Sequence, residues 1–133
     1  LLASSAASDV YKRQTHDNNT LRGWWEEELT VEEKAQLLVM LDQETALSDI
    51  DASPGDDCDT ELQPLKKLLA YLYSRQSDTV IVPLQDFLLL SSGGRMNLPG
   101  TTRGNWIWQA CDADLNEALA QQIATLTTKY KRA

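Results

Sequence analysis

Apolar residues recur at helical spacing along several stretches of the chain. One stretch predicts a helix from about Val31 to Gln43, because Thr30 and Glu33 have the spacing of a capping box that opens it. A second stretch predicts a helix from about Glu61 to Arg75. The expected apolar faces are Ala35, Leu37, Leu38 and Leu41 in the first helix, and Leu62, Leu65, Leu69 and Leu72 in the second. The pattern therefore favours a largely helical chain.

The second half of the chain mixes different patterns. Thr79–Val82 is short, apolar and β-branched, which is typical of a strand buried on both faces. Residues 85–109 show little periodicity and contain several glycines, so we expect a long ordered loop, of the kind that often carries function. A last helix is expected to open at Asp114, with Glu117 in its first turn, and to end near Lys131. Its expected buried stripe is Leu115, Leu119, Ile123, Leu126 and Tyr130.

Composition narrows the possible partners. The 133 residues carry a formal net charge of −8, and such acidity argues against nucleic acid or an anionic membrane as a partner. No apolar run approaches the roughly 18–20 residues of a membrane span. With His16 as the single histidine, and with Cys58 and Cys111 far apart, a zinc site is not expected. We therefore expect no cofactor and a cytoplasmic location, where lone cysteines stay reduced.

Two segments fit none of these patterns. Residues 4–14 read SSAASDVYKRQ, which is residue for residue the translation of a common transposase-type sequencing adapter. We interpret residues 1–14 as a non-native tail and residues 15–133 as the native sequence, a fragment that also lacks the strands with which Thr79–Val82 would pair. Residues 47–59 are acidic and are expected to form a solvated linker. A calcium loop is the alternative for this linker, but the spacing of an EF-hand fails.

Polar side chains that suit a sugar gather at two places. Thr15-His16-Asp17-Asn18 contains a carboxylate that can grip vicinal ring hydroxyls and an imidazole that can donate to a further hydroxyl. Much later, Asn97 offers paired hydrogen bonds, and Trp106 and Trp108 offer flat apolar faces. Each feature also has a structural interpretation, because the His-Asp pair can cap a turn and the tryptophans can be core anchors. Composition and spacing leave these alternatives open.

Taken together and in order, these motifs resemble those of the amylomaltases, the 4-α-glucanotransferases also called disproportionating enzymes. Thr15-His16-Asp17-Asn18 with Leu21-Arg22-Gly23-Trp24 is similar to their (S/T)-H-D…T…G-(W/Y) stretch. Val82-Pro83-Leu84-Gln85-Asp86 is similar to their VPLQD segment. Residues 95–101 and 104–108 are similar to their ARMNxPGTxxGNWxWR signature. The order of the motifs makes coincidence a poor explanation.

The resemblance implies a fold, a reaction and roles for particular residues. The family's fold is a (β/α)₈ barrel, so residues 15–133 would be an α/β C-terminal fragment of a TIM barrel, mostly helical in isolation with one or two short strands. The reaction would transfer α-1,4-glucan segments between maltooligosaccharides by a retaining double displacement. Asp17 would be the transition-state stabiliser, and His16 would contact the same sugar. Asn97 and Gly100 would lie at the active-site rim.

The resemblance also has limits. The family's nucleophile and general acid/base lie on earlier strands, outside this chain, so the fragment alone is expected to be inactive. Gln109 stands where the family usually has arginine, and Ser91-Ser92-Gly93-Gly94 replaces the usual lead-in to the signature. Two alternatives stay open: a small acidic helical interaction module, and a related retaining α-glucosidic hydrolase in which water takes the place of the acceptor sugar.

Overall fold

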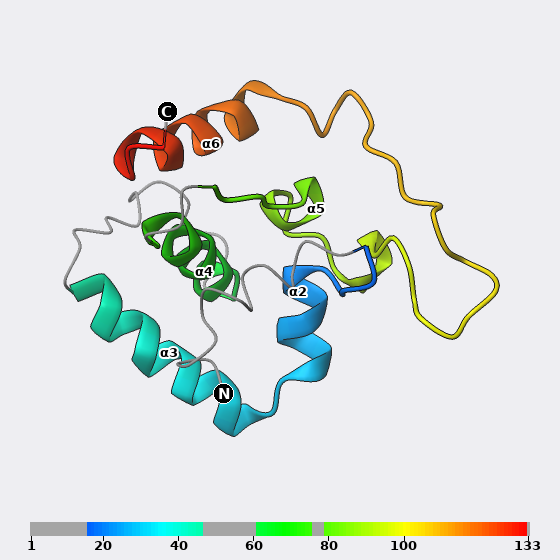
Figure 1. Cartoon of the computed structure of the whole chain (residues 1–133), viewed down its shortest axis with the longest axis horizontal. Coiled ribbons are helices and arrows are strands. Elements are labelled where there is room, and N and C mark those ends of the chain that lie inside the picture. The colour runs from blue at the N-terminus through cyan, green and yellow to red at the C-terminus, as the bar shows by residue number, and fades with distance from the viewer. Residues whose placement is uncertain (1–15, 47–60, 76–78, 133) are drawn as a thin grey trace.

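The structure is a computed structural model that describes residues 16–46, 61–75 and 79–132. These residues are mostly helical, as predicted, and Figure 1 shows the longer helices stacked beside one another with an extended loop at one side. The elements are α2 (Leu21–Gly23), the π-helix η1 (Trp24–Glu28), α3 (Val31–Ala46), α4 (Gln63–Ser74), α5 (Leu84–Phe87), the 3₁₀ helix η2 (Ser92–Gly94) and α6 (Glu117–Lys129). The predictions for residues 1–15 and 47–60 lie outside the described residues.

Helix α3 begins at the predicted capping box. The Thr30 backbone N–H donates to Glu33 Oε2 at 2.9 Å, and the Glu33 N–H donates to Thr30 Oγ1 at 3.2 Å. These two bonds satisfy backbone donors that the first turn of a helix leaves without partners. Leu37 and Leu41 are buried, whereas Ala35 is exposed, so the buried face is narrower than the predicted one.

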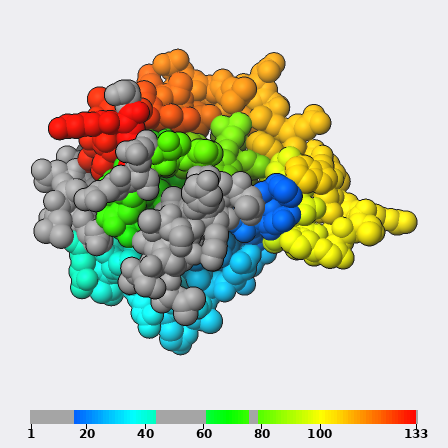
Figure 2. Space-filling view, viewed as in Figure 1, coloured from blue at the N-terminus to red at the C-terminus, as the bar shows by residue number. Residues whose placement is uncertain are grey.

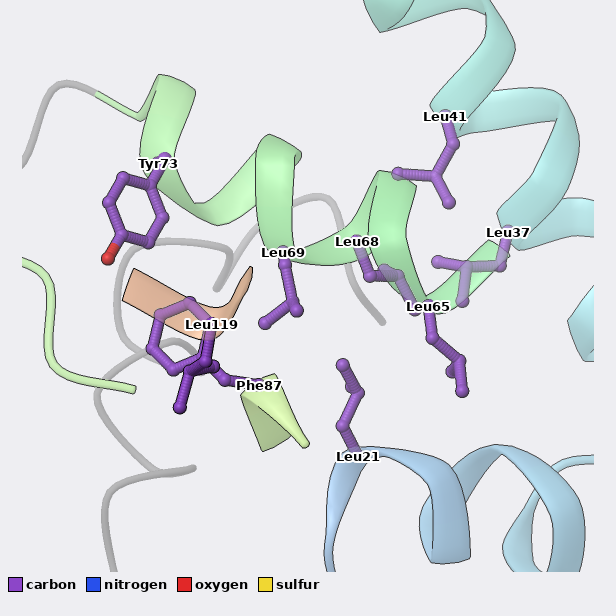
Figure 3. Packing of buried hydrophobic residues seen from close by; sticks show 9 residues of the cluster. All are labelled: Leu21, Leu37, Leu41, Leu65, Leu68, Leu69, Tyr73, Phe87 and Leu119. Atoms are coloured by element: carbon purple, nitrogen blue, oxygen red, sulfur yellow. The ribbon is translucent and has the colours of Figure 1, made fainter. Parts of the chain in front are cut away.

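Helix α4 is the centre of the packing, since it contacts both α3 and α6. Pro64 lies in its first turn, where the missing N–H costs nothing. Figure 3 shows its leucines facing Leu37 and Leu41 of α3 and approaching Phe87 and Leu119. The buried cluster is Leu21, Leu37, Leu41, Leu65, Leu68, Leu69, Tyr73, Phe87 and Leu119. Burying a leucine in this way contributes about 1.5–3 kcal/mol.

Helix α6 starts later than the sequence predicted. Its N-cap is Asn116, whose Oδ1 accepts from the Leu119 N–H at 3.0 Å. Asp114 instead accepts from the Cys111 N–H at 2.8 Å and so closes the turn before the helix. Leu115 therefore precedes the helix and is 62% exposed, so its predicted place in the buried stripe was wrong. Leu119 is buried, and Ile123, Leu126 and Tyr130 pack against the cluster as predicted.

The predicted strand at Thr79–Val82 is not a strand. None is found within residues 16–46, 61–75 and 79–132, and this segment runs as irregular chain into α5 after Pro83. Ile81 is 58% exposed while Val80 and Val82 pack against the buried cluster, so the segment is covered on one side rather than on both. A strand needs a neighbour for its N–H and C=O groups, and the described residues supply none.

The long predicted loop is partly folded. Its first part forms α5 and η2, and the chain from Arg95 to the start of α6 has no regular secondary structure. Figure 2 shows the middle of this loop, around residue 100, projecting from the body of the molecule. Among the described residues, no helix combines the length and apolar character that crossing a membrane requires.

Candidate functional site

The first wall of the candidate site is the turn that leads into α2. Thr20 is buried, and its Oγ1 accepts from the Gly23 N–H at 3.0 Å as the N-cap of the helix. Asn19 Oδ1 accepts from the Thr20 N–H at 2.9 Å. A Cβ atom at Gly23 would lie 2.4 Å from Asn19 Oδ1, so a larger residue here would displace the Asn19 side chain. The turn therefore fixes the direction from which His16 and Asp17 enter the site.

A buried carboxylate from α5 ties this turn to the second half of the chain. Asp86 is buried, and its Oδ1 accepts from the Leu21 N–H at 2.7 Å. Gly94 of η2 lies against the same turn, since a Cβ atom there would be 3.5 Å from Thr20 Cγ2 and 3.0 Å from Leu90. The turn that follows His16 and Asp17 is therefore in contact with the segment that precedes Asn97.

Asp17, His16 and Asn97 converge on one carboxylate oxygen. Asn97 Nδ2 donates to Asp17 Oδ1 at 2.6 Å, and His16 Nε2 lies 3.1 Å from the same oxygen. The His16 and Asp17 side chains are 56% and 49% exposed, so the cluster is open to solvent. The structure therefore brings together three of the four residues that the sequence singled out, across 80 positions of chain.

Arg95 completes this cluster and was not singled out from the sequence. Its Nη2 donates to the Asp17 backbone oxygen at 2.5 Å, and its Nε donates to the Asn97 backbone oxygen at 2.8 Å. One guanidinium thus holds both sides of the cluster in a fixed relation, which suits the rigid fork of donors that arginine carries. The only signal in the sequence was its position at the start of the family-like stretch 95–101.

Gly100 lies in the turn that follows the cluster rather than within it. Its φ is +82°, and it follows Pro99 in a turn where the Thr101 N–H donates to the Leu98 oxygen at 3.2 Å. Proline followed by a glycine with positive φ is typical of a type II turn. The place of a Cβ atom at Gly100 has no neighbour within 4 Å. This glycine shapes the projecting loop, where its positive φ, and not a lack of space, favours glycine.

An open cleft of about 210 Å³ lies beside the cluster. Residues of the turn that leads into α2 and residues between Pro83 and Met96 line it. Its lining residues are His16, Asn18, Asn19, Thr20, Pro83, Gln85, Asp86, Gly94, Arg95 and Met96. In the part of the chain that the structure describes, no group of three or more His, Cys, Asp or Glu side chains has the arrangement of a metal site.

Comparison with known proteins agrees with the motifs that form this site. Residues 3–113 match the family described as 4-alpha-glucanotransferase. This chain belongs to that family. The resemblance inferred from the motifs is thereby confirmed. The matched range begins within residues 1–14, and the interpretation of that stretch as adapter-derived stays a prediction.

The individual relatives are much longer than this chain. It is 31% identical to a 4-alpha-glucanotransferase of Streptococcus pneumoniae over 95% of this chain and 22% of the relative. It is 36% identical to a chloroplastic/amyloplastic 4-alpha-glucanotransferase of Arabidopsis thaliana over 89% of this chain and 18% of the relative. The chain therefore spans about a fifth of the length of the curated relatives it matches.

A solved structure shows a similar arrangement. The amylomaltase from Streptococcus agalactiae, solved in complex with acarbose, superposes with a TM-score of 0.71 at 33% identity. The likeness covers 90% of this chain and 21% of that one. The helical arrangement of the described residues is thus similar to that of one part of an amylomaltase.

Proposed function

We propose that residues 15–133 are the C-terminal part of a (β/α)₈ 4-α-glucanotransferase and carry one wall of its active site, with residues 1–14 as a non-native tail. The relatives are about five times longer than this chain, which supports a fragment of a larger catalytic domain. The observation that carries the proposal is the convergence of His16, Asp17 and Asn97 from two family motifs. The family match also argues against a self-contained interaction module.

The reaction would be a retaining transfer in two displacements. A carboxylate nucleophile attacks the anomeric carbon of an α-1,4-glucan, while a carboxylic acid protonates the departing glycosidic oxygen. The hydroxyl of a second maltooligosaccharide then attacks the glucosyl-enzyme bond and loses its proton to the same acid/base group. Both of these carboxyl groups would come from the part of the enzyme that precedes this chain. Acarbose in the amylomaltase neighbour supports a substrate of this class.

Asp17 would stabilise the transition state of this reaction. Both described contacts of its side chain use Oδ1, which leaves Oδ2 to accept from a ring hydroxyl. As the sugar ring flattens and gains positive charge, a hydrogen bond from its hydroxyl to a carboxylate strengthens. His16 uses Nε2 toward Asp17, so its other ring nitrogen can bond the same sugar. Asn97 and Arg95 would keep the carboxylate in position.

The test uses the full-length enzyme, restored by joining residues 15–133 to their own upstream coding sequence. With maltotriose as the only substrate, a transferase produces glucose together with longer maltooligosaccharides, which chromatography resolves. A retaining hydrolase would produce shorter sugars without the longer ones, and that result would overturn the proposed transfer. The 133-residue chain alone is expected to release no glucose, because the described residues bring one carboxylate to the cluster. A cytoplasmic location stays a prediction.

A further inference from the structure

Trp106 has a backbone conformation that a tryptophan rarely adopts. Its φ is +62°, in the left-handed region, where the Cβ atom of a residue other than glycine costs free energy. The conformation is held in place by the Trp106 N–H, which donates to the Met96 oxygen at 2.7 Å. A second hydrogen bond joins the same two parts of the loop, because Asn105 Oδ1 accepts from the Leu98 N–H at 2.9 Å. The loop is therefore folded back on itself to present this residue.

Burial does not repay the cost of this conformation. Trp106 is 56% exposed, although tryptophan usually gains its stabilisation by covering apolar area. Trp24 and Trp25 behave in the usual way, since both are half-buried and pack against the core cluster. Within the described residues, Trp106 is therefore not the core anchor that the sequence left open. Strain that packing does not repay is typical of residues at functional sites.

The indole ring lies at the edge of the polar cluster. Its centroid is 4.9 Å from that of the His16 ring, with 43° between the ring planes. His16 in turn contacts Asp17, so an apolar ring face, an imidazole and a carboxylate follow one another along the surface. A glucose ring has a flat face of C–H groups and a rim of hydroxyls. An aromatic face beside hydrogen-bonding groups complements both.

We propose that Trp106 is a sugar-stacking residue of this site, and this inference rests on the proposed function. Its indole face would pack against a glucose unit of the α-1,4-glucan, next to the unit whose hydroxyls bond to Asp17. His16 contacts both the indole ring and Asp17, so the ring lies close enough to the carboxylate to meet a neighbouring unit of the same glucan. Stacking of this kind does not depend on the charge of the transition state. It therefore contributes to substrate binding and leaves the chemical step largely unchanged.

The experiment measures KM and kcat for maltotriose disproportionation in the restored full-length enzyme. Trp106→Leu keeps an apolar side chain without a ring face, and is expected to raise KM about tenfold with kcat within about twofold. Trp106→Phe keeps a ring face, and its KM is expected to stay within about threefold of the unaltered enzyme. The control is Ile107→Ala, a neighbouring residue that is 72% exposed, and its KM should not change.

The outcomes separate the stacking from the proposed function. An active enzyme in which Trp106→Leu leaves KM unchanged overturns the stacking alone. An equal rise in KM for Trp106→Leu and Ile107→Ala shows a disturbed loop and overturns it as well. If the unaltered enzyme is inactive, calorimetry with acarbose decides: binding that Trp106→Leu weakens and Trp106→Phe preserves supports the stacking without the transfer. Loss of both activity and acarbose binding overturns both inferences.

Discussion

The helical core and the Asp17 cluster are built by different means. In the core, Leu41 and Leu65 are 0% exposed, and their packing holds α3 and α4 together beside one exposed ion pair between Lys67 and Asp42. In the cluster, the side chains of His16 and Asp17 are about half exposed, and one hydrogen bond from Asn97 ties Asp17 to a segment 80 positions away. Stability thus comes largely from side chains that exclude water, whereas the proposed chemistry would use side chains that are exposed to it.

Leu21 is the residue that joins these two regions. Its side chain belongs to the buried cluster, and its backbone N–H donates to Asp86 beneath the site. The turn that positions His16 and Asp17 therefore leads directly into Leu21, a buried residue. An exposed cluster can keep a defined geometry when the elements beneath it are rigid, which is how functional side chains are generally positioned. Because of this difference, we expect substitutions in the core to change stability and substitutions in the cluster to change turnover.

The largest effect is expected from Asp17→Asn in the restored full-length enzyme. Asparagine can still accept from Asn97 but lacks the charge that would stabilise the transition state, so kcat should fall by about a hundredfold or more. The thermal midpoint should be unchanged, because this side chain is exposed. Steady-state rates with maltotriose and a thermal melt give both values. The control is Asp112→Asn, an exposed carboxylate outside the cluster. Near-normal turnover of Asp17→Asn would contradict its proposed role.

Leu41→Ala in the core is expected to show the opposite pattern, a large loss of stability. Removing a fully buried leucine from the packing with α4 should cost about 2–5 kcal/mol in the free energy of unfolding. Urea unfolding of the 133-residue chain, followed by circular dichroism, measures this loss. Val39→Ala on the same helix is the matched control, because Val39 is 57% exposed and should change stability by less than about 0.5 kcal/mol. Equal losses for the two variants would mean that α3 does not pack as described.

Local signals in the sequence predicted the helices better than the contacts between them. Helix α3 could be predicted because Thr30 and Glu33 cap it without help from the rest of the chain. The start of α6 could not, because Asp114 and Asn116 are both good N-cap residues and only the folded turn at Cys111 uses one of them. The strand at Thr79–Val82 failed because burial on both faces depends on neighbours that periodicity does not report.

The site was predictable in its parts but not in its geometry. His16, Asp17 and Asn97 could be named because they stand in family motifs, but nothing in their spacing brings residues 80 positions apart to one oxygen. The clamp formed by Arg95 uses backbone oxygens, which every residue has, so no side-chain pattern reveals it. The positive φ of Trp106 is equally hidden, since sequence rules assign that conformation to glycine or asparagine.

A smaller effect on the core side is expected from Asn116→Ala. The variant removes the acceptor of the Leu119 N–H and should destabilise the chain by about 1 kcal/mol through fraying of α6. Asp114→Ala is the comparison, because the sequence alone favoured Asp114 as the cap. Asp114→Ala is expected to loosen the turn before the helix and to leave the amide protection of α6 unchanged. Hydrogen exchange at Leu119 and Ala120 distinguishes the two caps, and greater exchange in Asp114→Ala would contradict the assignment.

The smallest effect is a pH dependence at the start of α3. Hydrogen bonds from Thr30, first from its backbone N–H, hold the pKa of Glu33 below the ordinary value of 4.5. Because folding lowers this pKa, the contribution of Glu33 to stability is complete above pH 4.5 and is lost as the pH falls through the lower folded value. Glu33→Gln can keep the hydrogen bond but cannot titrate. The thermal midpoint of the 133-residue chain should therefore fall further on acidification than that of the variant. The hydrogen bond from Cys111 also lowers the pKa of Asp114. Both proteins contain Asp114, so its contribution cancels when the thermal midpoint of Glu33→Gln is subtracted from that of the unaltered chain at each pH. A difference that does not change between pH 6 and pH 3 would show that the capping box does not form in solution.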